Sequence, residues 1–167
     1  MQPPMNSPRE LAAYLERTVA TELPNLRAIP DGPETAAPNR PSGEGWSQRE
    51  ELGHLVDSAV NNHARFVRAT LEPTYAGPGY DQEGWVAVHR YQEIPWKELV
   101  DVWHAHNRIL LRLIAAIPPA KLATPCRVGG VGAGLVTLGF MIDDYVLHMQ
   151  HHLDNVLRRS PPTKYPR

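Results

Sequence analysis

Three histidines in two parts of the sequence are the residues most able to take part in metal chemistry. His148 and His152 lie four residues apart in a stretch with helical periodicity, so both imidazoles fall on one face, about one turn apart. His54 lies far earlier in the chain. Two imidazoles so placed can bind one divalent cation at ~2.0–2.1 Å, and a third from another helix would leave a coordination position open, as in catalytic sites. On spacing alone a second interpretation stays open, in which the pair belongs to a helix surface that binds nothing.

Three neutral imidazoles would leave such a cation its full positive charge. Water bound to it would have its pKa lowered from about 15.7 toward about 7, which suits hydrolysis. A bound thiol would be deprotonated, which suits transfer of a low-molecular-weight thiol to an electrophile. The same three ligands serve both reactions. Ligation requires neutral histidines, so we expect metal affinity to fall in acid.

Several neighbouring polar residues are candidates for supporting roles. Asp57 follows His54 by one helical turn, and we expect it to orient a ligand or to accept a proton from bound water. The alternative is an ordinary surface aspartate. Glu51 and Asn155 are weaker candidates on the helix sides that carry the histidines. Cys126 has no base at local spacing, so the sequence does not favour a nucleophilic cysteine.

The other histidines are expected to be structural or exposed. His63 and His106 fall on apolar stripes, which predicts buried, hydrogen-bonded core residues. His89 and His104 are expected to be exposed or to line the cleft, with His89 the better candidate because it lies in a long connection. His151 points away from its neighbouring pair and is expected to face solvent.

The helix side that carries His54 is polar and has two interpretations. Its other polar residues are Glu51, Asp57, Ser58 and Asn61. This side can be a solvated surface, the usual position of a polar helix face, or the wall of a site between helices. Helix geometry alone favours the surface, whereas the histidine pair elsewhere in the chain favours the site.

Four helices are predicted to position these residues. They fit residues 8–21, 48–71, 95–117 and 138–159. The second begins at a capping box formed by Ser47 and Glu50, with Trp46 outside it as a candidate hydrophobic staple. Thr137 caps the fourth helix, whose negative end would suit Arg159. Four helices joined by long connections predict an all-α four-helix bundle that forms one domain over residues 1–167.

The connections between these helices are predicted to be long and irregular. Five prolines between residues 24 and 41 mark the first connection, because proline interrupts helices. The second connection, residues 72–94, carries Tyr80, Asp81 and Trp85, which we expect to cover the cleft. The glycine-rich stretch 126–135 predicts a small hairpin with a turn at residues 130–132.

Composition excludes several classes of function. The net charge is -1 with histidines neutral, so no nucleic-acid partner is indicated. The single cysteine cannot form an internal disulfide. The sequence shows no signal peptide and no apolar helix long enough to span a bilayer. We therefore expect a protein of the cytoplasm that does not interact with membranes.

Beyond these local patterns, the chain resembles the DinB/YfiT-like superfamily. The likeness rests on four segments in matching order and spacing: Trp46-Ser47-Gln48-Arg49-Glu50, Gly53-His54-Leu55-Val56-Asp57-Ser58, Tyr80-Asp81-Gln82 with Trp85, and Tyr145-Val146-Leu147-His148-Met149-Gln150-His151-His152. It extends over about residues 8–160 and points to the YfiT-type metal-dependent hydrolases, which are related to bacillithiol S-transferases.

The resemblance implies a four-helix bundle in which three histidines hold a divalent metal ion, usually zinc or nickel. Matched position by position, the ligands are His54, His148 and His152. The resemblance also implies a small-molecule substrate, with low-molecular-weight thiols as one class, and a homodimer for many members. The chain departs from the family at Gly53, where many relatives have a second histidine. It also departs at Leu147, where an aromatic residue is usual, and this bears more on the substrate pocket than on the metal.

Three hypotheses for function therefore remain. The first is a metal-dependent enzyme, a hydrolase or a thiol S-transferase, that acts on a small molecule. The second is a non-catalytic metal-binding protein of the stress response. The third is a structural bundle whose histidines never meet.

Overall fold

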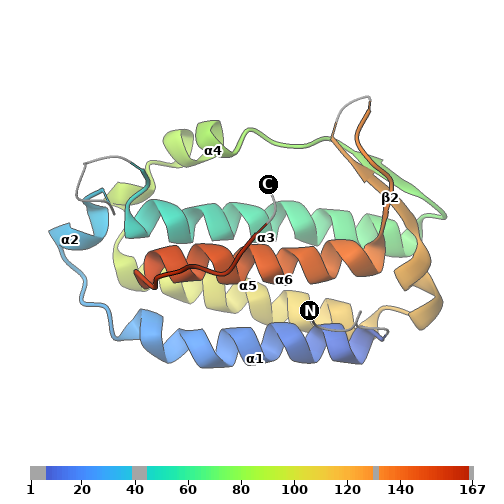
Figure 1. Ribbon diagram of the computed structural model, residues 1–167, viewed down its shortest axis with the longest axis horizontal. Coiled ribbons are helices and arrows are strands. Elements are labelled where there is room, and N and C mark those ends of the chain that lie inside the picture. The colour runs from blue at the N-terminus through green and yellow to red at the C-terminus, as the bar shows by residue number, and fades with distance from the viewer. Residues whose placement is uncertain (1–6, 39–44, 130–131, 166–167) are drawn as a thin grey trace.

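Four long helices form the body of the protein in a computed structural model that describes residues 7–38, 45–129 and 132–165. They are α1 (Pro8–Arg27), α3 (Gln48–Leu71), α5 (Trp96–Ala116) and α6 (Leu138–Val156). Both α1 and α3 pack against α5 and α6, and the four helices run side by side along the long axis of the molecule (Figure 1). The predicted all-α four-helix bundle is confirmed.

The apolar faces of these helices meet in a core that contains large aromatic side chains. Phe66 of α3, Trp103 of α5 and Tyr145 of α6 are buried. The rings of Phe66 and Tyr145 meet edge to face at 5.9 Å, and the Tyr145 hydroxyl donates to Asn107 at 2.7 Å. Fully burying a side chain such as that of Phe66 contributes about 1.5–3 kcal/mol. This packing fixes α3 against α6, the two helices that carry the candidate ligands.

The predicted caps set where α3 and α6 begin. The Ser47 side chain accepts a hydrogen bond from the Glu50 backbone, and the Glu50 carboxylate accepts one from the Ser47 backbone, which is the predicted capping box. Thr137 caps α6 with its hydroxyl alone, which accepts a hydrogen bond of 3.1 Å from the Phe140 backbone. The prediction of a hydrophobic staple at Trp46 is wrong, because the position in α3 that should offer an apolar partner holds Glu51. The caps fix the register in which both helices present their side chains.

The first helix extends beyond its predicted end near Thr21. It continues to Arg27, with Pro24 inside it. Leu26 is fully buried, and its carbonyl accepts a hydrogen bond of 2.8 Å from the indole of Trp96. Packing against α5 thus compensates for the backbone hydrogen bond that proline cannot donate.

The fourth helix ends earlier than predicted. It stops at Val156 and not at Arg159. Arg158 has a φ of 54°, which lies outside the right-handed helical region. Arg159 turns back to form ion pairs with Glu22 of α1 and Asp154 of α6. The ion pairs give this arginine a role in joining two helices of the bundle.

The connections are less irregular than predicted. The first contains a short helix, α2 (Pro33–Ala36), and Pro41 lies outside the described residues. The second contains strand β1 (Tyr75–Gly77), helix α4 (Gln82–His89) and a 3₁₀ helix, η1 (Tyr91–Glu93). The side chain of Asp81 caps α4 by accepting from the Gly84 backbone at 3.0 Å. Both α4 and η1 pack against α3, so this connection covers the helix that carries His54 (Figure 1).

The glycine-rich stretch forms part of a small sheet at one end of the bundle (Figure 1). Strand β2 (Pro125–Val128) pairs antiparallel with β3 (Val136–Thr137), as the predicted hairpin requires, and parallel with β1. A second 3₁₀ helix, η2 (Pro119–Ala123), precedes β2. The predicted turn at residues 130–132 lies mostly outside the described residues. Within the described ranges, no helix has an apolar run of the length needed to cross a bilayer.

Candidate metal centre

Three histidine rings from two helices meet between α3 and α6. The Nε2 atoms of His54 and His148 are 3.1 Å apart, and one ring nitrogen from each of His54, His148 and His152 lies within 4.8 Å of the other two. Nitrogens that share a tetrahedral zinc ion at ~2.0–2.1 Å are about 3.4 Å apart. Small ring rotations would therefore bring all three nitrogens to one cation. Among the described residues, this is the one cluster of histidine, cysteine and carboxylate side chains with such proximity.

The polar side of α3 forms a wall between helices and not a solvated surface. His54 is completely buried, and Glu51, Asp57 and Ser58 are buried with it. The capping box at the start of α3 places this side toward α6, whose own polar edge carries the other two rings. The sequence left open a solvated surface or the wall of a site between helices, and the burial of these side chains favours the wall between helices.

Burial keeps two of the three rings uncharged. Burial, and after it the neighbouring His152 ring, lowers the pKa of His54 to about 3. Burial, followed by the adjacent histidines, lowers the pKa of His148 to about 2. A ligating imidazole must be neutral, and these two are neutral over the whole physiological range. The donor set therefore fits a divalent cation.

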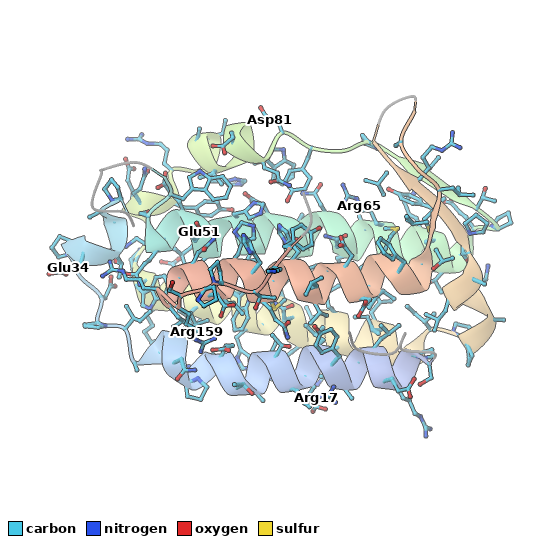
Figure 2. All side chains as sticks on the ribbon, viewed as in Figure 1. Arg17, Glu34, Glu51, Arg65, Asp81 and Arg159 are labelled. Atoms are coloured by element: carbon cyan, nitrogen blue, oxygen red, sulfur yellow. The ribbon has the colours of Figure 1, made fainter. Side chains whose placement is uncertain are left out.

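The carboxylate of Glu51 orients the third ring. Its Oε2 atom lies 2.7 Å from Nδ1 of His152, so Nδ1 donates and Nε2 is left as the acceptor nitrogen. The side chains of both residues are largely buried, and Glu51 projects from the first turns of α3 (Figure 2). A carboxylate on the outer nitrogen of a histidine fixes its tautomer and raises its basicity as a ligand. The sequence signal for this role was the position of Glu51 one turn before His54.

Trp46 covers the histidine cluster. Its ring centroid lies 4.9 Å from that of His54 and 6.2 Å from that of His152. Its Nε1 donates to Oε2 of Glu83, on α4, at 3.2 Å. The residue expected to staple the start of α3 therefore lies against the rings and is bonded to the edge of the covering helix.

Asp57 lies one turn beyond His54, but its contacts are with Tyr91 and His89 and not with the three clustered histidines. Its Oδ1 atom accepts a hydrogen bond of 2.5 Å from the Tyr91 hydroxyl, and Nδ1 of the exposed His89 is 3.4 Å from the same oxygen. Burial raises the pKa of Asp57, although Tyr91 and His89 oppose the shift. Its Oδ2 atom is buried without a hydrogen-bond partner among the described residues. Asp57 is not in the histidine cluster, and its expected catalytic role stays a prediction.

Tyr91 also accounts for the glycine that precedes His54. A Cβ atom added to Gly53 would lie 2.2 Å from ring carbons of Tyr91, which is far inside van der Waals contact. The ring can therefore pack against α3 only because this position has no side chain. The space beside Gly53 is taken by the aromatic ring whose hydroxyl reaches Asp57.

A cavity of about 520 Å³ opens beside the rings. Its lining includes Trp46, Glu51, Glu83, His148, His152 and Tyr165. The Tyr165 ring lies 5.2 Å from His148 between centroids, and its hydroxyl donates to Asp144 at 2.8 Å. The sequence did not indicate Tyr165, because it lies beyond the last helix and reaches the site only through the fold.

Some of the residues that line the cavity differ from those expected to cover the cleft. Gln82 of α4 lines the cavity, as does Asn155 of α6, the weaker candidate. Tyr80 and Trp85, which were expected to cover the cleft, pack against each other with centroids 5.2 Å apart. The second connection thus reaches the site through the first turn of α4.

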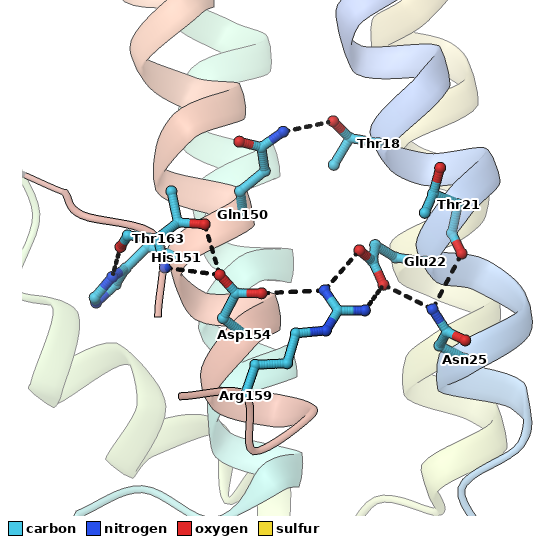
Figure 3. A network of polar contacts seen from close by, with 9 residues as sticks. All are labelled: Thr18, Thr21, Glu22, Asn25, Gln150, His151, Asp154, Arg159 and Thr163. Carbon is cyan, nitrogen blue, oxygen red and sulfur yellow. Dashed lines mark hydrogen bonds and ion pairs between the residues drawn. The ribbon is translucent and has the colours of Figure 1, made fainter. Parts of the chain in front are cut away.

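The residues after α6 are fixed to the bundle by a polar network (Figure 3). Asp154 accepts hydrogen bonds from the backbone and the hydroxyl of Thr163 at 2.7 and 2.6 Å. Arg159 donates to Asp154 and, with both terminal nitrogens, to Glu22. This network holds the segment that carries Tyr165 beside α6.

The remaining histidines depart partly from expectation. His151 is half-buried and not solvent-exposed, with Nδ1 2.7 Å from the carbonyl of Thr163. His63 and His106 are hydrogen-bonded, as predicted, and each is the other's partner at 3.1 Å, but both are only half-buried. His104 is half-buried as well. Cys126 is buried and burial raises its pKa, which disfavours the thiolate.

Comparisons with known proteins agree with the geometry. The family model of the DinB superfamily matches residues 14–155. The chain is 24% identical over 112 residues to an Oceanobacillus iheyensis protein named "Putative metal-dependent hydrolase". That match covers 67% of this chain and 63% of the relative, so it spans less than two thirds of the relative's length.

The fold is similar to that of YfiT from Bacillus subtilis, described as a probable metal-dependent hydrolase with an unusual four-helix bundle topology. The TM-score is 0.79 at 20% sequence identity, over 94% of this chain and 90% of that one. At this identity the likeness concerns the fold.

Proposed function

The chain belongs to the DinB superfamily, and from this premise we propose that it is a metal-dependent hydrolase of a small molecule, with His54, His148 and His152 as metal ligands. The proposal is carried by one observation, the convergence of three ring nitrogens within 4.8 Å of one another beside a cavity. The names given to its relatives support the same class of activity. We propose zinc or nickel as the ion, since imidazole suits both metals.

The chain's own residues prepare this site in three ways. A bound divalent ion would supply Lewis acidity toward water, a thiol or a carbonyl group. Burial keeps His54 and His148 neutral. Glu51 holds the proton of His152 on Nδ1. The Trp46 ring covers one side of the cluster, 4.9 Å from the His54 ring between centroids, and electrostatic interactions are stronger where contact with water is reduced.

For Asp57 we propose a positioning or proton-accepting role. The support is its place one turn after His54 and its buried, unpartnered Oδ2 atom. An Asp57→Asn substitution keeps the shape and the bond from Tyr91 but removes the charge. We expect it to lower turnover by about 10²-fold, a typical contribution of a general base, with metal content nearly unchanged. Unchanged turnover would remove Asp57 from the mechanism.

The first experiment measures metal in protein purified without a histidine tag. We expect one tightly bound zinc or nickel ion per chain, lost in a His148→Ala variant. His106→Ala is the matched control, because it removes a half-buried histidine of the separate pair. Protein that binds no ion in the presence of excess zinc and nickel would leave only the structural bundle.

The second experiment measures turnover and separates enzyme from binding protein. Metal-loaded protein is given activated esters and amides and, in parallel, bacillithiol or mycothiol with an electrophilic dye. Metal-dependent hydrolysis would support the proposal, whereas metal-dependent dye conjugation would assign a thiol S-transferase. Metal binding without turnover in any assay would favour a non-catalytic metal-binding protein of the stress response.

Two further expectations accompany the proposal. We propose that the protein acts in the cytoplasm, for which the support is the sequence pattern alone. The homodimer implied by the family resemblance stays a prediction. Light scattering coupled to size-exclusion chromatography would test it directly.

A further inference from the structure

The lining of the cavity beside the histidine cluster is acidic and aromatic. Glu51 and Glu83 contribute carboxylates, and Trp46 and Tyr165 contribute rings. Among the described residues, no lysine or arginine lines this cavity. A cleft lined by one sign of charge concentrates ligands of the opposite sign. Glu51 is bonded to His152 and its charge would be offset by a bound divalent ion. The carboxylate of Glu83 is therefore the charge that remains for a ligand, and it disfavours a free carboxylate or phosphate beside α4.

The carboxylate of Glu83 has no cationic partner in the described part of the chain. Its Oε2 accepts only from a neutral donor, the indole of Trp46 at 3.2 Å. Carboxylates at other places on the bundle are paired with guanidinium groups, as Asp31 is with Arg49 and Glu22 is with Arg159. The ion pairs between described residues include none at Glu83. Its charge is therefore available to a ligand.

The two rings stand against different members of the histidine cluster. Trp46 packs on His54 and His152, and Tyr165 packs on His148 at 5.2 Å. Each ring is held by a hydrogen bond, from Trp46 to Glu83 and from Tyr165 to Asp144. The negative face of an aromatic ring attracts a cation within about 6 Å, and tryptophan does so best. The Trp46 ring beside the Glu83 carboxylate is therefore an arrangement that can bind an organic cation.

We propose that this cavity binds a small molecule that carries a positively charged amine. The ammonium group lies at Glu83 and the ring of Trp46, while the reacting group of the same molecule lies at the histidine cluster. The inference rests on the proposed function, because it assumes that the cavity is the substrate site. It adds the chemical class of the substrate, which the histidines do not determine.

The binding test compares two probes of the same shape and different charge. Choline carries a quaternary ammonium, and 3,3-dimethylbutan-1-ol is its uncharged isostere. Calorimetric titration of the full chain, with zinc and without it, measures both affinities. We expect choline to bind at least about tenfold more tightly in both forms, since the charge and the cation–π contact add. Equal affinities for the two probes would overturn the proposal.

Glu83→Gln is the decisive variant. Glu83 is exposed and glutamine can still accept from the Trp46 indole, so we expect this variant to fold. The preference for choline should fall to about threefold or less, the share left to the rings. Glu34→Gln removes an exposed carboxylate of α2 outside the cavity and should leave the preference unchanged. A preference of about tenfold that is undiminished in Glu83→Gln would overturn the assignment.

The outcome is independent of the metal question. Charge preference in the metal-free chain tests the amine site, whereas zinc stoichiometry tests the metal site. Absence of bound zinc with a retained choline preference would sink the proposed hydrolase and keep the amine site. One zinc per chain without a choline preference would overturn the amine site and leave the proposed hydrolase standing.

Discussion

Helix α3 carries two histidines that each face a histidine of another helix, yet the two arrangements differ. His54 meets His148 of α6, and His63 meets His106 of α5, with nitrogens 3.1 Å apart in both. His63 follows His54 by nine positions, so the two side chains project from opposite sides of α3 at about 100° per residue. Both contacts look alike as pairs.

The surroundings of the two pairs separate them. The first pair, His54 with His148, has a third ring within reach, a carboxylate on that ring, and a cavity beside it. For the second pair, the described residues offer no third ligand within the same reach. Two close imidazoles are therefore insufficient evidence for a metal site. A third donor and an outer carboxylate distinguish a candidate metal centre from a hydrogen-bonded pair.

The largest expected effect comes from removing one histidine of each pair in turn. His54→Ala should weaken zinc binding by more than about 100-fold, beyond the range for changes outside the ligand shell. His63→Ala, on the same helix, should leave one ion per chain. Competition against a chromophoric chelator measures both affinities. Equal losses in the two variants would remove the distinction between the pairs.

Much of the bundle was predictable because its signals are local. The capping box at Ser47 fixed the start of α3, and its end at Leu71 also agrees with prediction. The end of α1 was not predictable, since Leu26 and Trp96 hold the helix together beyond Pro24 through tertiary packing. Within the second connection, α4 is short and packs on α3, so its periodic signal is weak.

The candidate site divides in a similar way. His148 and His152 follow from helical spacing, and the family resemblance added His54. The contact of Glu51 with His152 joins two helices, and Tyr165 arrives from a segment fixed by Asp154. Contacts of this kind depend on how distant parts of the chain pack, which periodicity does not encode.

Acid should destabilise the metal-free protein through the first pair. The folded pKa values of His54 and His148, about 3 and about 2, lie below the ordinary value of 6.5. As pH falls below 6.5, the unfolded chain binds protons that the folded state does not, so stability falls by up to about 1.4 kcal/mol per pH unit for each group. Burial lowers the pKa of His106 as well.

Urea unfolding in the presence of a chelator, between about pH 7 and pH 5, measures this slope. His148→Gln should flatten it by up to about 1.4 kcal/mol per pH unit, and His106→Gln should flatten it less. A steeper contribution from His106 would mean that the second pair is the more strongly desolvated one.

A smaller effect is expected at Gly53, the residue next to His54, where the ring of Tyr91 packs against α3. Gly53→Ala should destabilise the fold by about 1–3 kcal/mol through overpacking, although alanine itself favours the helix by about 0.5–1 kcal/mol. Gly134→Ala is the control, because a Cβ there meets nothing within 4 Å. In a Tyr91→Ala background the same Gly53→Ala change should become neutral or stabilising. Urea unfolding checks each variant, and persistent destabilisation without Tyr91 would exclude this ring as the cause.

The smallest expected effect tests the outer carboxylate itself. Glu51→Gln should weaken zinc binding about tenfold, at the low end for such a partner, because the amide oxygen can still accept from Nδ1 of His152. Glu50→Gln is matched in position and keeps the capping box, which accepts glutamine, so its zinc affinity should not change. Unchanged affinity in Glu51→Gln would mean that the bond orients the ring without raising its basicity. For metal affinity, the difference between the two histidine pairs would then lie in the third ring and not in the basicity supplied by the carboxylate.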